Sequence, residues 1–364
     1  MPEKQKKVPP VRLVRAIDRV RAVLQQIHRS TVPPGLAVLE LATGAWTTQI
    51  IWVAAKLGVA DQLSSGPRRP ADIADRIGAD PDALYRLMRA LASKGLLKER
   101  RDGKFALTKI GEALRSDTEG SMRDMVLFIG HRTRWEDWGN LMHSVQTGEP
   151  SVDKLRGMPF FAYLDTDPEL AEVFNNAMTA TSGITNEIAL GHYDFTGFTL
   201  IADVGGGHGA LLSTILRRAP QARGLLYDLP SVVEGADATL KAAGVADRCA
   251  REGGSFLERV PDGADAYMMK NIIHDWDDDS ALTILRNIRT AIAPHGKLLL
   301  LEMVLPEQAN SFLGFQLDIE MLITVGGRER TRAEYANLFA RAGFRLTRVV
   351  DTVTPVSIIE AVPA

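Results

Sequence analysis

The stretch Asp203-Val204-Gly205-Gly206-Gly207-His208-Gly209-Ala210 decides the fold. It follows a short apolar run at 199–204 and opens a helical pattern at 210–219. Glycines at such a turn let the backbone bend tightly and let a ligand approach without Cβ atoms in the way. The amino end of the next helix also offers free N–H groups to an anionic group. The stretch therefore predicts a nucleoside-type ligand at the first turn of a parallel sheet.

From residue 199 onward, short apolar runs alternate with helical patterns. This alternation is typical of a parallel sheet covered by helices on both faces. The predicted strands lie at 199–204, 224–227, 264–269 and 297–303, with a weaker one at 249–251. The predicted helices between them lie at 210–219, 231–243 and 280–292. Two further strands, 344–350 and 357–361, predict an antiparallel hairpin at the edge of the sheet.

Asp228 ends the second predicted strand. An acid at this place accepts hydrogen bonds from ribose hydroxyls. The pattern Gly205-x-Gly207-x-x-Ala210 also fits a dinucleotide fingerprint. The glycine turn and Asp228 therefore indicate an adenosine-type ligand, and at this point NAD and S-adenosylmethionine both stay open.

A histidine and two acids end up at the same edge of the predicted sheet. His274 lies in the run Lys270–Asp278 just after the 264–269 strand, and Glu302 ends the next strand. Glu329 precedes a helix that Thr331 caps. A histidine after a strand is often only a structural hydrogen-bonding residue, but two converging carboxylates also suit a general base. Both interpretations stay open on the residues alone.

The N-terminal half has two parts. After Pro33-Pro34-Gly35, a long helical pattern with a wide apolar face predicts a large partner, for which a second copy of the chain is one candidate. Between residues 59 and 115, a pattern of three helices and a hairpin around Asp102-Gly103 indicates a winged-helix layout. That layout suits DNA binding or a protein–protein platform, and the net charge of −2 favours the platform.

The segment from Gly120 to about Asn186 is helical and rich in aromatic residues. Such residues form either a core or the wall of a substrate pocket. The whole chain of 364 residues predicts two domains, and its single cysteine, Cys249, excludes an intramolecular disulfide. Leu298–Leu305, taken as the most apolar stretch, is too short to cross a membrane. The basic N-terminus lacks the apolar region of a secretory signal.

Several motifs together resemble one family, the caffeate-type O-methyltransferases of plants and their bacterial relatives in natural-product pathways. The resemblance covers about residues 35–362. It rests on five segments, namely Asp203–Gly209, Tyr227–Pro230, Lys270–Asp277, Glu302–Pro306 and Gly326–Thr331.

The resemblance implies a role for particular residues. His274 matches the catalytic base, and Glu302 and Glu329 match the acids that flank it. The matches to cofactor-binding positions are Asp203, Gly205, Gly207, Asp228, Leu229, Ser255, Phe256 and Lys270. The matches to the acceptor pocket are Phe160, Phe174, Met178 and Met321. Ser255 replaces the usual aspartate, which predicts weaker cofactor binding, and Thr181 stands where plant enzymes often have histidine.

The fold class expected is α/β: a Rossmann-like methyltransferase domain with a mostly parallel sheet and an antiparallel terminal hairpin, preceded by an all-α winged-helix-like dimerisation domain. The predicted boundaries are a basic extension at 1–34, the dimerisation domain at 35–118, a helical acceptor-pocket segment at 119–186 and the catalytic domain at 187–364. The expected partners are a small-molecule hydroxyl acceptor and a second subunit, without nucleic acid or membrane, in the cytoplasm.

The function expected is SN2 methyl transfer from S-adenosylmethionine to a phenolic or enolic hydroxyl of an aromatic or polyketide-like molecule, without a metal. His274 would remove the hydroxyl proton. The alternatives are a family member that has lost methyl transfer and hydroxylates or decarboxylates instead, a winged-helix regulator that senses a small molecule, and an NAD-dependent oxidoreductase.

Overall fold

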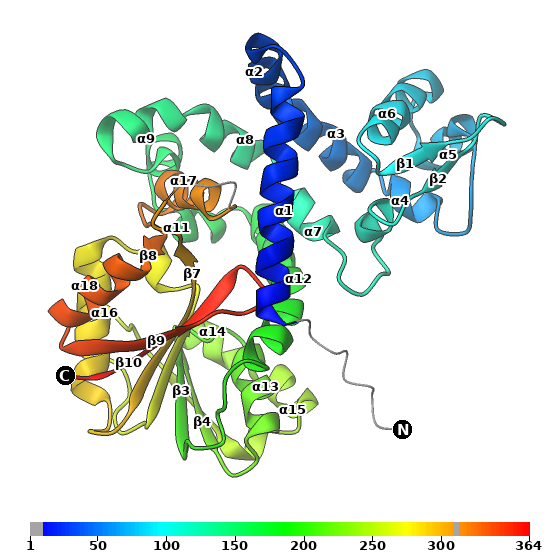
Figure 1. Cartoon of the computed structure of the whole chain (residues 1–364). Coiled ribbons are helices and arrows are strands. Elements are labelled where there is room, and N and C mark those ends of the chain that lie inside the picture. Colours follow the sequence, from blue (N-terminus) through cyan, green and yellow to red (C-terminus); the bar gives the residue numbers. More distant parts are fainter. Residues whose placement is uncertain (1–9, 309–312) are drawn as a thin grey trace. The chain divides into compact units, whose positions relative to one another are not determined.

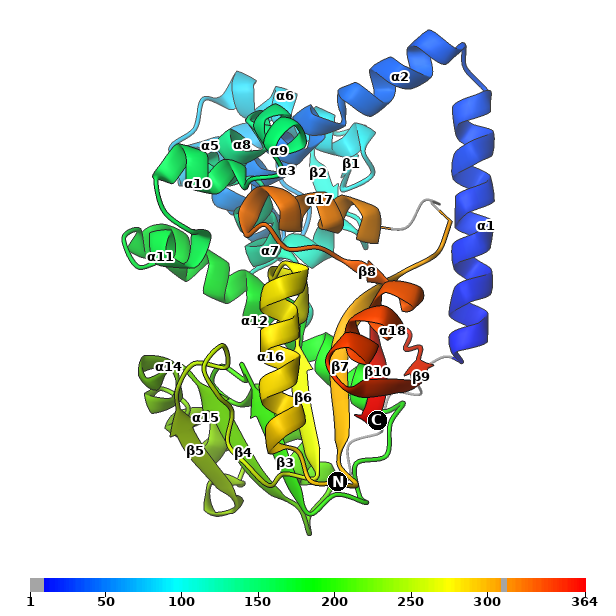
Figure 2. The same cartoon turned by 90° about the vertical axis from the view of Figure 1, so that its left-hand side faces the viewer.

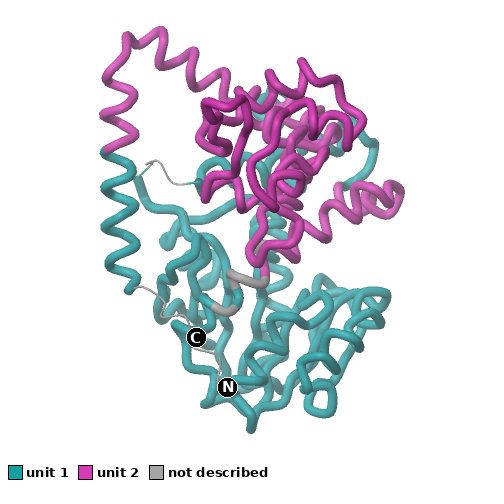
Figure 3. Tube along the Cα trace, turned by 90° about the vertical axis from the view of Figure 1, so that its right-hand side faces the viewer, with its two compact units in different colours: residues 1–23, 142–159, 185–364 teal, residues 24–141, 160–184 magenta. Residues whose placement is uncertain are grey.

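The computed structural model describes residues 10–308 and 313–364, without the side chains of residues 181, 183–185 and 187. The first nine residues of the predicted extension and the side chain of Thr181 therefore lie outside the described residues. The chain divides into two compact units, which Figure 3 colours separately. Unit 1 comprises residues 1–23, 142–159 and 185–364, and unit 2 comprises residues 24–141 and 160–184. The predicted domain boundaries stay predictions.

Unit 1 contains the predicted sheet (Figure 1), whose strands lie in the order β5-β4-β3-β6-β7-β10-β9 (Figure 2). The five strands from β5 to β7 are parallel, and β10 pairs antiparallel with both β7 and β9. The short strand β8 pairs with β7. The bounds are β3 (Leu200–Val204), β4 (Arg223–Asp228), β5 (Cys249–Gly253), β6 (Ala266–Lys270), β7 (Lys297–Leu305), β8 (Arg330–Thr331), β9 (Phe344–Val350) and β10 (Val356–Pro363). The α/β fold with its terminal hairpin is confirmed.

Helices cover both faces of this sheet, so its central strands are apolar on both sides. Along β7, Leu298 and Leu300 pack with the side chains of α16 (Asp278–Ala291) and α18 (Arg332–Arg341). Their neighbours Leu299 and Leu301 belong to the opposite cluster, together with residues of α13 (Ala210–Arg218) and α15 (Asp237–Ala242). The alternation of the pleat therefore divides one apolar run between two cores.

The helix predicted at 231–243 is two helices, α14 (Pro230–Glu234) and α15. Gly235 and Ala236 separate them, and glycine has a low helix propensity. Unit 1 also holds α9 (Leu141–Thr147), α10 (Ser151–Arg156), α17 (Gly314–Thr324) and the short 3-10 turns η2 (Ala246–Arg248) and η3 (Ile273–Asp275).

Unit 2 holds the predicted winged-helix layout. Asp80 caps α6 (Pro81–Ser93), accepting a hydrogen bond from the backbone N–H of Ala83 at 2.8 Å. A two-stranded antiparallel hairpin, β1 with β2, follows it. The elements are α2 (Pro34–Ala42), α3 (Gly44–Lys56), α4 (Val59–Gln62), α5 (Pro70–Ile77), α6 (Pro81–Ser93), β1 (Leu97–Glu99), β2 (Phe105–Leu107), η1 (Gly111–Leu114), α7 (Arg123–Ile129), α8 (Arg132–Gly139) and α11 (Phe160–Leu164).

Three helices belong to both units: α1 (Val11–Ser30), α12 (Pro168–Leu190) and α9, of which only the first residue, Leu141, lies in unit 2. The long pattern after Pro33 is two helices rather than one, because Thr43 ends α2 and its hydroxyl bonds back to the carbonyls of Leu39 and Glu40. Taken together, Pro34–Lys56 has a mean hydropathy of 1.3 over its most apolar window and is long and apolar enough to cross a membrane by composition alone. The sequence prediction rested on Leu298–Leu305 alone, which is too short, and did not consider this longer candidate.

Candidate active site

The turn between β3 and α13 has the conformation that its glycines predict. Gly205, Gly207 and Gly209 adopt positive φ values of 71°, 57° and 79°, which residues with a side chain rarely adopt. A Cβ on Gly206 would lie 2.7 Å from the carboxyl carbon of Asp203. A Cβ on Gly207 would meet nothing within 4 Å, so the backbone there borders open space. This is the cradle that a ligand needs for close approach to the amino end of α13.

Asp228 ends β4 next to this turn. Its carboxylate accepts hydrogen bonds from the backbone N–H of Gly207 at 2.8 Å and from that of Leu229 at 2.7 Å. Leu229 itself is 55% exposed. Asp203 lies beneath the turn, buried, and its Oδ2 has no hydrogen-bond partner among the described residues. Burial is the main cause that raises the pKa of Asp203 to about 7, and repulsion from Asp228 adds to the shift.

Ser255 and Phe256 follow β5. The Ser255 hydroxyl accepts a hydrogen bond from the backbone N–H of Leu257 at 3.3 Å. The Phe256 ring packs edge-to-face against Trp276, with 5.8 Å between ring centroids. Phe256 therefore connects the predicted cofactor edge to the segment that carries His274.

Lys270 ends β6, and its Nζ donates to the Oδ1 atom of Asn186 at 2.6 Å. Burial lowers the pKa of Lys270 to about 8, although Asp203 and Glu302 raise it. The next residue, Asn271, adopts a φ of +51°, a left-handed conformation that asparagine tolerates better than most residues. This sharp turn carries the chain from β6 into η3.

His274 lies in η3 among three carboxylates. Its Nδ1 is 2.8 Å from Oε1 of Glu329 and 3.8 Å from Oε2 of Glu302, while its Nε2 is 3.4 Å from Oδ1 of Asp275. The two glutamate side chains are almost fully buried, whereas that of His274 is 15% exposed. These distances confirm the prediction that His274, Glu302 and Glu329 converge.

Burial by itself lowers the pKa of His274, but the charge of Glu302 and the hydrogen bond with Glu329 outweigh it and raise that pKa to about 10. Burial raises the pKa of Glu302 to about 7 and that of Asp275 to about 6, although His274 opposes both shifts. The negative charges around His274 therefore strongly favour its imidazolium form.

The segment before β8 holds the His274 backbone in place. The backbone N–H of Arg328 donates to the His274 carbonyl at 2.8 Å. The buried guanidinium of Arg330 donates to the carbonyls of Ile273 at 3.1 Å and Trp276 at 3.0 Å, and to Asp278 at 2.8 Å. Because these bonds bracket His274 on both sides, they hold the stretch of backbone from which its ring projects.

Glycine is also required in this segment. A Cβ on Gly327 would lie 2.0 Å from the carbonyl oxygen of His274, far inside van der Waals contact. The two backbones can therefore approach only because residue 327 has no side chain.

Comparisons with known proteins agree with this geometry. Residues 138–345 match the O-methyltransferase domain family, and residues 39–117 match the O-methyltransferase dimerisation domain. The chain belongs to the O-methyltransferase family. The enzymes of this family use S-adenosylmethionine, and the open glycine cradle with Asp228 beside it fits that cofactor.

Individual relatives cover nearly the whole methyltransferase. A phenazine O-methyltransferase from Lysobacter antibioticus is 42% identical over 335 residues, which are 91% of this chain and 97% of the relative. The crystal structure of LaPhzM superposes with a TM-score of 0.84 at 42% identity, covering 92% of this chain and all of that one. A neocarzinostatin-pathway O-methyltransferase, solved with S-adenosylmethionine and 2-hydroxy-5-methyl naphthoic acid, has a TM-score of 0.76 at 33% identity and covers 87% and 96% of the two chains.

The predicted acceptor-pocket residues of the methyltransferase fall in both units. Phe160, Phe161 and Phe174 form an edge-to-face cluster in unit 2, with centroid distances between 5.5 and 6.3 Å. Met178 follows on α12, also in unit 2, whereas Met321 lies on α17 in unit 1. Phe160 is buried, which a core residue also would be, so its contact with an acceptor stays a prediction.

The sequence prediction was inaccurate or silent at three residues. Glu302 does not end β7, which continues for three residues to Leu305. No role was predicted for Asp275, although it directly follows the histidine, and none for Arg330, which lies one residue after Glu329. Their adjacency in sequence was a signal, but only the fold shows that both side chains turn toward the His274 segment.

The cluster around His274 also has the spacing of a metal site. His274, Glu302 and Glu329 offer ligand atoms within 4.8 Å of one another, a spacing that could hold a metal ion.

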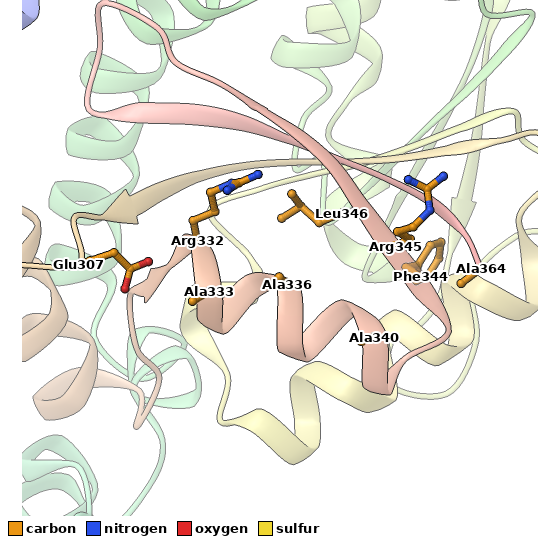
Figure 4. A pocket seen from close by; sticks show the side chains of 9 residues that line it. All are labelled: Glu307, Arg332, Ala333, Ala336, Ala340, Phe344, Arg345, Leu346 and Ala364. Atoms are coloured by element: carbon orange, nitrogen blue, oxygen red, sulfur yellow. The ribbon is translucent and has the colours of Figure 1, made fainter.

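A hollow lies elsewhere in unit 1. It has a volume of about 560 Å³, is bordered by α18 and β9, and is lined by alanines and by Arg332 and Arg345 (Figure 4). None of the predicted site residues lines this hollow, so the sequence gives it no role in methyl transfer.

Proposed function

We propose that His274 is the general base of a metal-independent methyl transfer to a phenolic or enolic hydroxyl on an aromatic or polyketide-like small molecule. The observation that carries the proposal is the hydrogen bond from Nδ1 to Glu329, with Glu302 behind it. That arrangement fixes the tautomer and stabilises the imidazolium that forms when Nε2 accepts a proton. Nε2 is then the ring nitrogen available to an acceptor.

The pKa of His274 supports this role energetically. An ordinary histidine has a pKa near 6.5 and a phenol one near 10, so complete proton transfer between them costs roughly 5 kcal/mol. The carboxylates around His274 raise its pKa to about 10, which removes most of that gap. The same shift means that the neutral base becomes more abundant as pH rises, so turnover increases with pH.

Asp275 contributes at the other ring nitrogen. Its carboxylate lies 3.4 Å from Nε2, on the side where the acceptor hydroxyl must approach. We infer that Asp275 helps to position that hydroxyl. Its pKa, which burial raises to about 6, leaves the carboxyl mostly ionised at neutral pH, so it can accept a hydrogen bond from the hydroxyl.

The cofactor would be held by Gly205, Gly207, Asp228, Leu229 and Lys270. Asp203, Ser255 and Phe256 complete the proposed set at the same edge of the sheet. When bound, S-adenosylmethionine supplies an electrophilic methyl group, and S-adenosylhomocysteine remains after transfer to the acceptor oxygen. Asp228 would exchange part of its bonding with Gly207 and Leu229 for ribose hydroxyls.

The acceptor class follows from chemistry and from relatives. The similar proteins named above act on a phenazine or bind a hydroxynaphthoate. An aromatic ring lowers the pKa of its hydroxyl, and such a ring suits a pocket wall of phenylalanines. We infer that Phe160, Phe174, Met178 and Met321 line the acceptor pocket, and that aliphatic alcohols are poor substrates.

The assembly is proposed to be a cytoplasmic homodimer through the N-terminal domain, without nucleic acid or membrane. The dimerisation-domain match at 39–117 supports the dimer. The proposed boundaries are an extension at 1–34, a dimerisation domain at 35–118, an acceptor-pocket segment at 119–186 and a catalytic domain at 187–364.

The test compares His274→Ala with His295→Ala, whose side chain is exposed in a loop before β7. We expect turnover to fall by a factor of about 10² or more in the first variant, with cofactor affinity nearly unchanged, and no loss in the second. Turnover is measured as S-adenosylhomocysteine formed with hydroxyphenazines, hydroxynaphthoates, an aniline analogue and an aliphatic alcohol. Equal losses of turnover and cofactor binding would make His274 structural.

A relative that has lost methyl transfer is the remaining alternative. It would bind S-adenosylmethionine and consume an aromatic acceptor without releasing S-adenosylhomocysteine. Mass analysis of the same reactions separates the two functions, because methylation adds a methyl group whereas hydroxylation or decarboxylation does not.

A further inference from the structure

The first helix of the chain, α1, has an apolar stripe that no part of its own structure buries. Every residue of α1 is described, and none of them is buried. Six of its large apolar side chains are between 49% and 58% exposed, which is unusual for so many on one helix of a folded protein. They are Leu13, Ile17, Val20, Val23, Leu24 and Ile27.

The spacing of the stripe is that of a helix-pairing seam. Leu13, Ile17, Val20, Leu24 and Ile27 follow one another at intervals of four, three, four and three residues. This is the alternation of a and d positions in a heptad repeat, in which side chains of one helix fit between those of another. The helix turns its charged residues, including Arg12, Arg15 and Arg19, away from this seam.

The composition of the seam favours a protein partner over a lipid surface. It contains only leucine, isoleucine and valine, whereas helices that lie in a membrane interface usually add tryptophan or phenylalanine. We propose that the seam packs against a second copy of this chain and enlarges the dimer interface beyond the dimerisation domain.

Continuity along the chain identifies the second copy as the occupant. Three residues after α1, the chain enters α2, where Leu36, Val38, Leu39 and Leu41 are also at least half exposed. The match to the dimerisation domain begins within α2, at residue 39. The seam therefore leads directly into the surface on which the family pairs its subunits, and this inference rests on the homodimer proposed above.

Charge also favours a second copy. Residues 1–30 carry eight basic and two acidic side chains, a net charge of +6, so residues 31–364 carry −8 within the total of −2. A basic segment that docks on another subunit of this chain meets an excess of acidic groups. The attraction is strongest at low ionic strength.

The test uses two double variants of the full chain with equal charge. Leu24→Glu with Ile27→Glu places carboxylates in the seam, whereas Gln25→Glu with Gln26→Glu places them on the polar face of the same turn. Sedimentation velocity over a dilution series measures the dimer dissociation constant. We expect the seam variant to raise it at least about tenfold, because a carboxylate is costly to bury, and the control to change it little.

Hydrogen exchange over residues 11–30 gives a second readout. The wild-type dimer should protect these amides, and the seam variant should lose that protection while keeping its methyl-transfer turnover per subunit. Equal dissociation constants for the two variants, or an unprotected α1 in a wild-type dimer, would overturn the inference alone. A wild-type chain that stays monomeric would overturn the homodimer as well. If the seam variant lost the wild type's binding to phosphatidylserine vesicles while its dimer dissociation constant stayed unchanged, the seam would be assigned to a membrane contact and the inference would be overturned.

Discussion

The substitution Glu329→Gln tests the electrostatic role of the carboxylate that binds the proposed base. The side chain is 2% exposed, and its Oε1 lies 2.8 Å from Nδ1 of His274. Glutamine keeps an oxygen that can accept the same hydrogen bond, so the change removes mainly the negative charge. Without that charge the imidazolium is less stable, and the pKa of His274 must fall from its present value of about 10.

The size of the fall has two bounds. A hydrogen bond to a charged group exceeds a neutral one by about 1–2 kcal/mol, which is about one pKa unit. The attraction of two unit charges 4 Å apart is about 4 kcal/mol at an effective dielectric constant of 20, which is about three units. We therefore expect an apparent pKa between about 7 and 9 in the variant.

The assay is the pH profile of kcat/KM from pH 6 to 11, read from S-adenosylhomocysteine formation, together with NMR titration of ¹³C-labelled histidine. The rising limb should move to lower pH, and the plateau at high pH should fall because a weaker base transfers the proton less readily. Glu334→Gln is the control, since Glu334 bonds to the backbone of Thr331 in the cap of α18. An unchanged or raised pKa in Glu329→Gln would refute the claim that this carboxylate stabilises the imidazolium.

Four further outcomes follow from the same site. Gly327→Ala places a Cβ against the His274 carbonyl, so it should lower the free energy of unfolding by about 1–3 kcal/mol and reduce kcat more than KM. Thermal unfolding and steady-state kinetics check these two effects. Arg330→Met should destabilise by about 1–3 kcal/mol for each buried carbonyl left unpaired, and a stable variant with normal kcat would contradict its positioning role. Dialysis against EDTA should leave turnover unchanged, and restoration of lost turnover by a divalent cation would instead make the His274 cluster a metal site. The raised pKa of His274 stabilises the fold fully below about pH 6.5 and loses this effect as pH rises through about 10, so wild type should lose more unfolding free energy than His274→Gln between pH 8 and 11.

The sheet could be predicted closely because its strands are buried on both faces and bounded by turn residues. The terminal strand predicted at 344–350 is observed with the same bounds, and the glycine turn adopts the positive φ values that its residues imply. The predictions were less accurate where local signals were weak. One helical pattern at 231–243 proved to be two helices around Gly235, and the apolar stretch after Pro33 breaks at Thr43.

The candidate site was predictable in its members but not in its electrostatics. A strand followed by His274 and a second strand carrying Glu302 place both residues at one edge of a parallel sheet, which the sequence pattern already indicated. The hydrogen bonds from Arg330 to the carbonyls of Ile273 and Trp276, and that between His274 and Glu329, depend on how two distant segments of the chain fold back on each other. No periodicity in the sequence reports such a contact.

The sequence by itself determined the class of the protein. Its glycine turn and acidic strand end indicate an adenosine-type ligand, and its motifs together resemble the O-methyltransferases, since each signal depends on residues that are neighbours in the chain. The tertiary structure alone decided the protonation chemistry. The pKa of a buried histidine depends on charges brought within a few ångströms from β7 and from the turn before β8, and those distances exist only after folding.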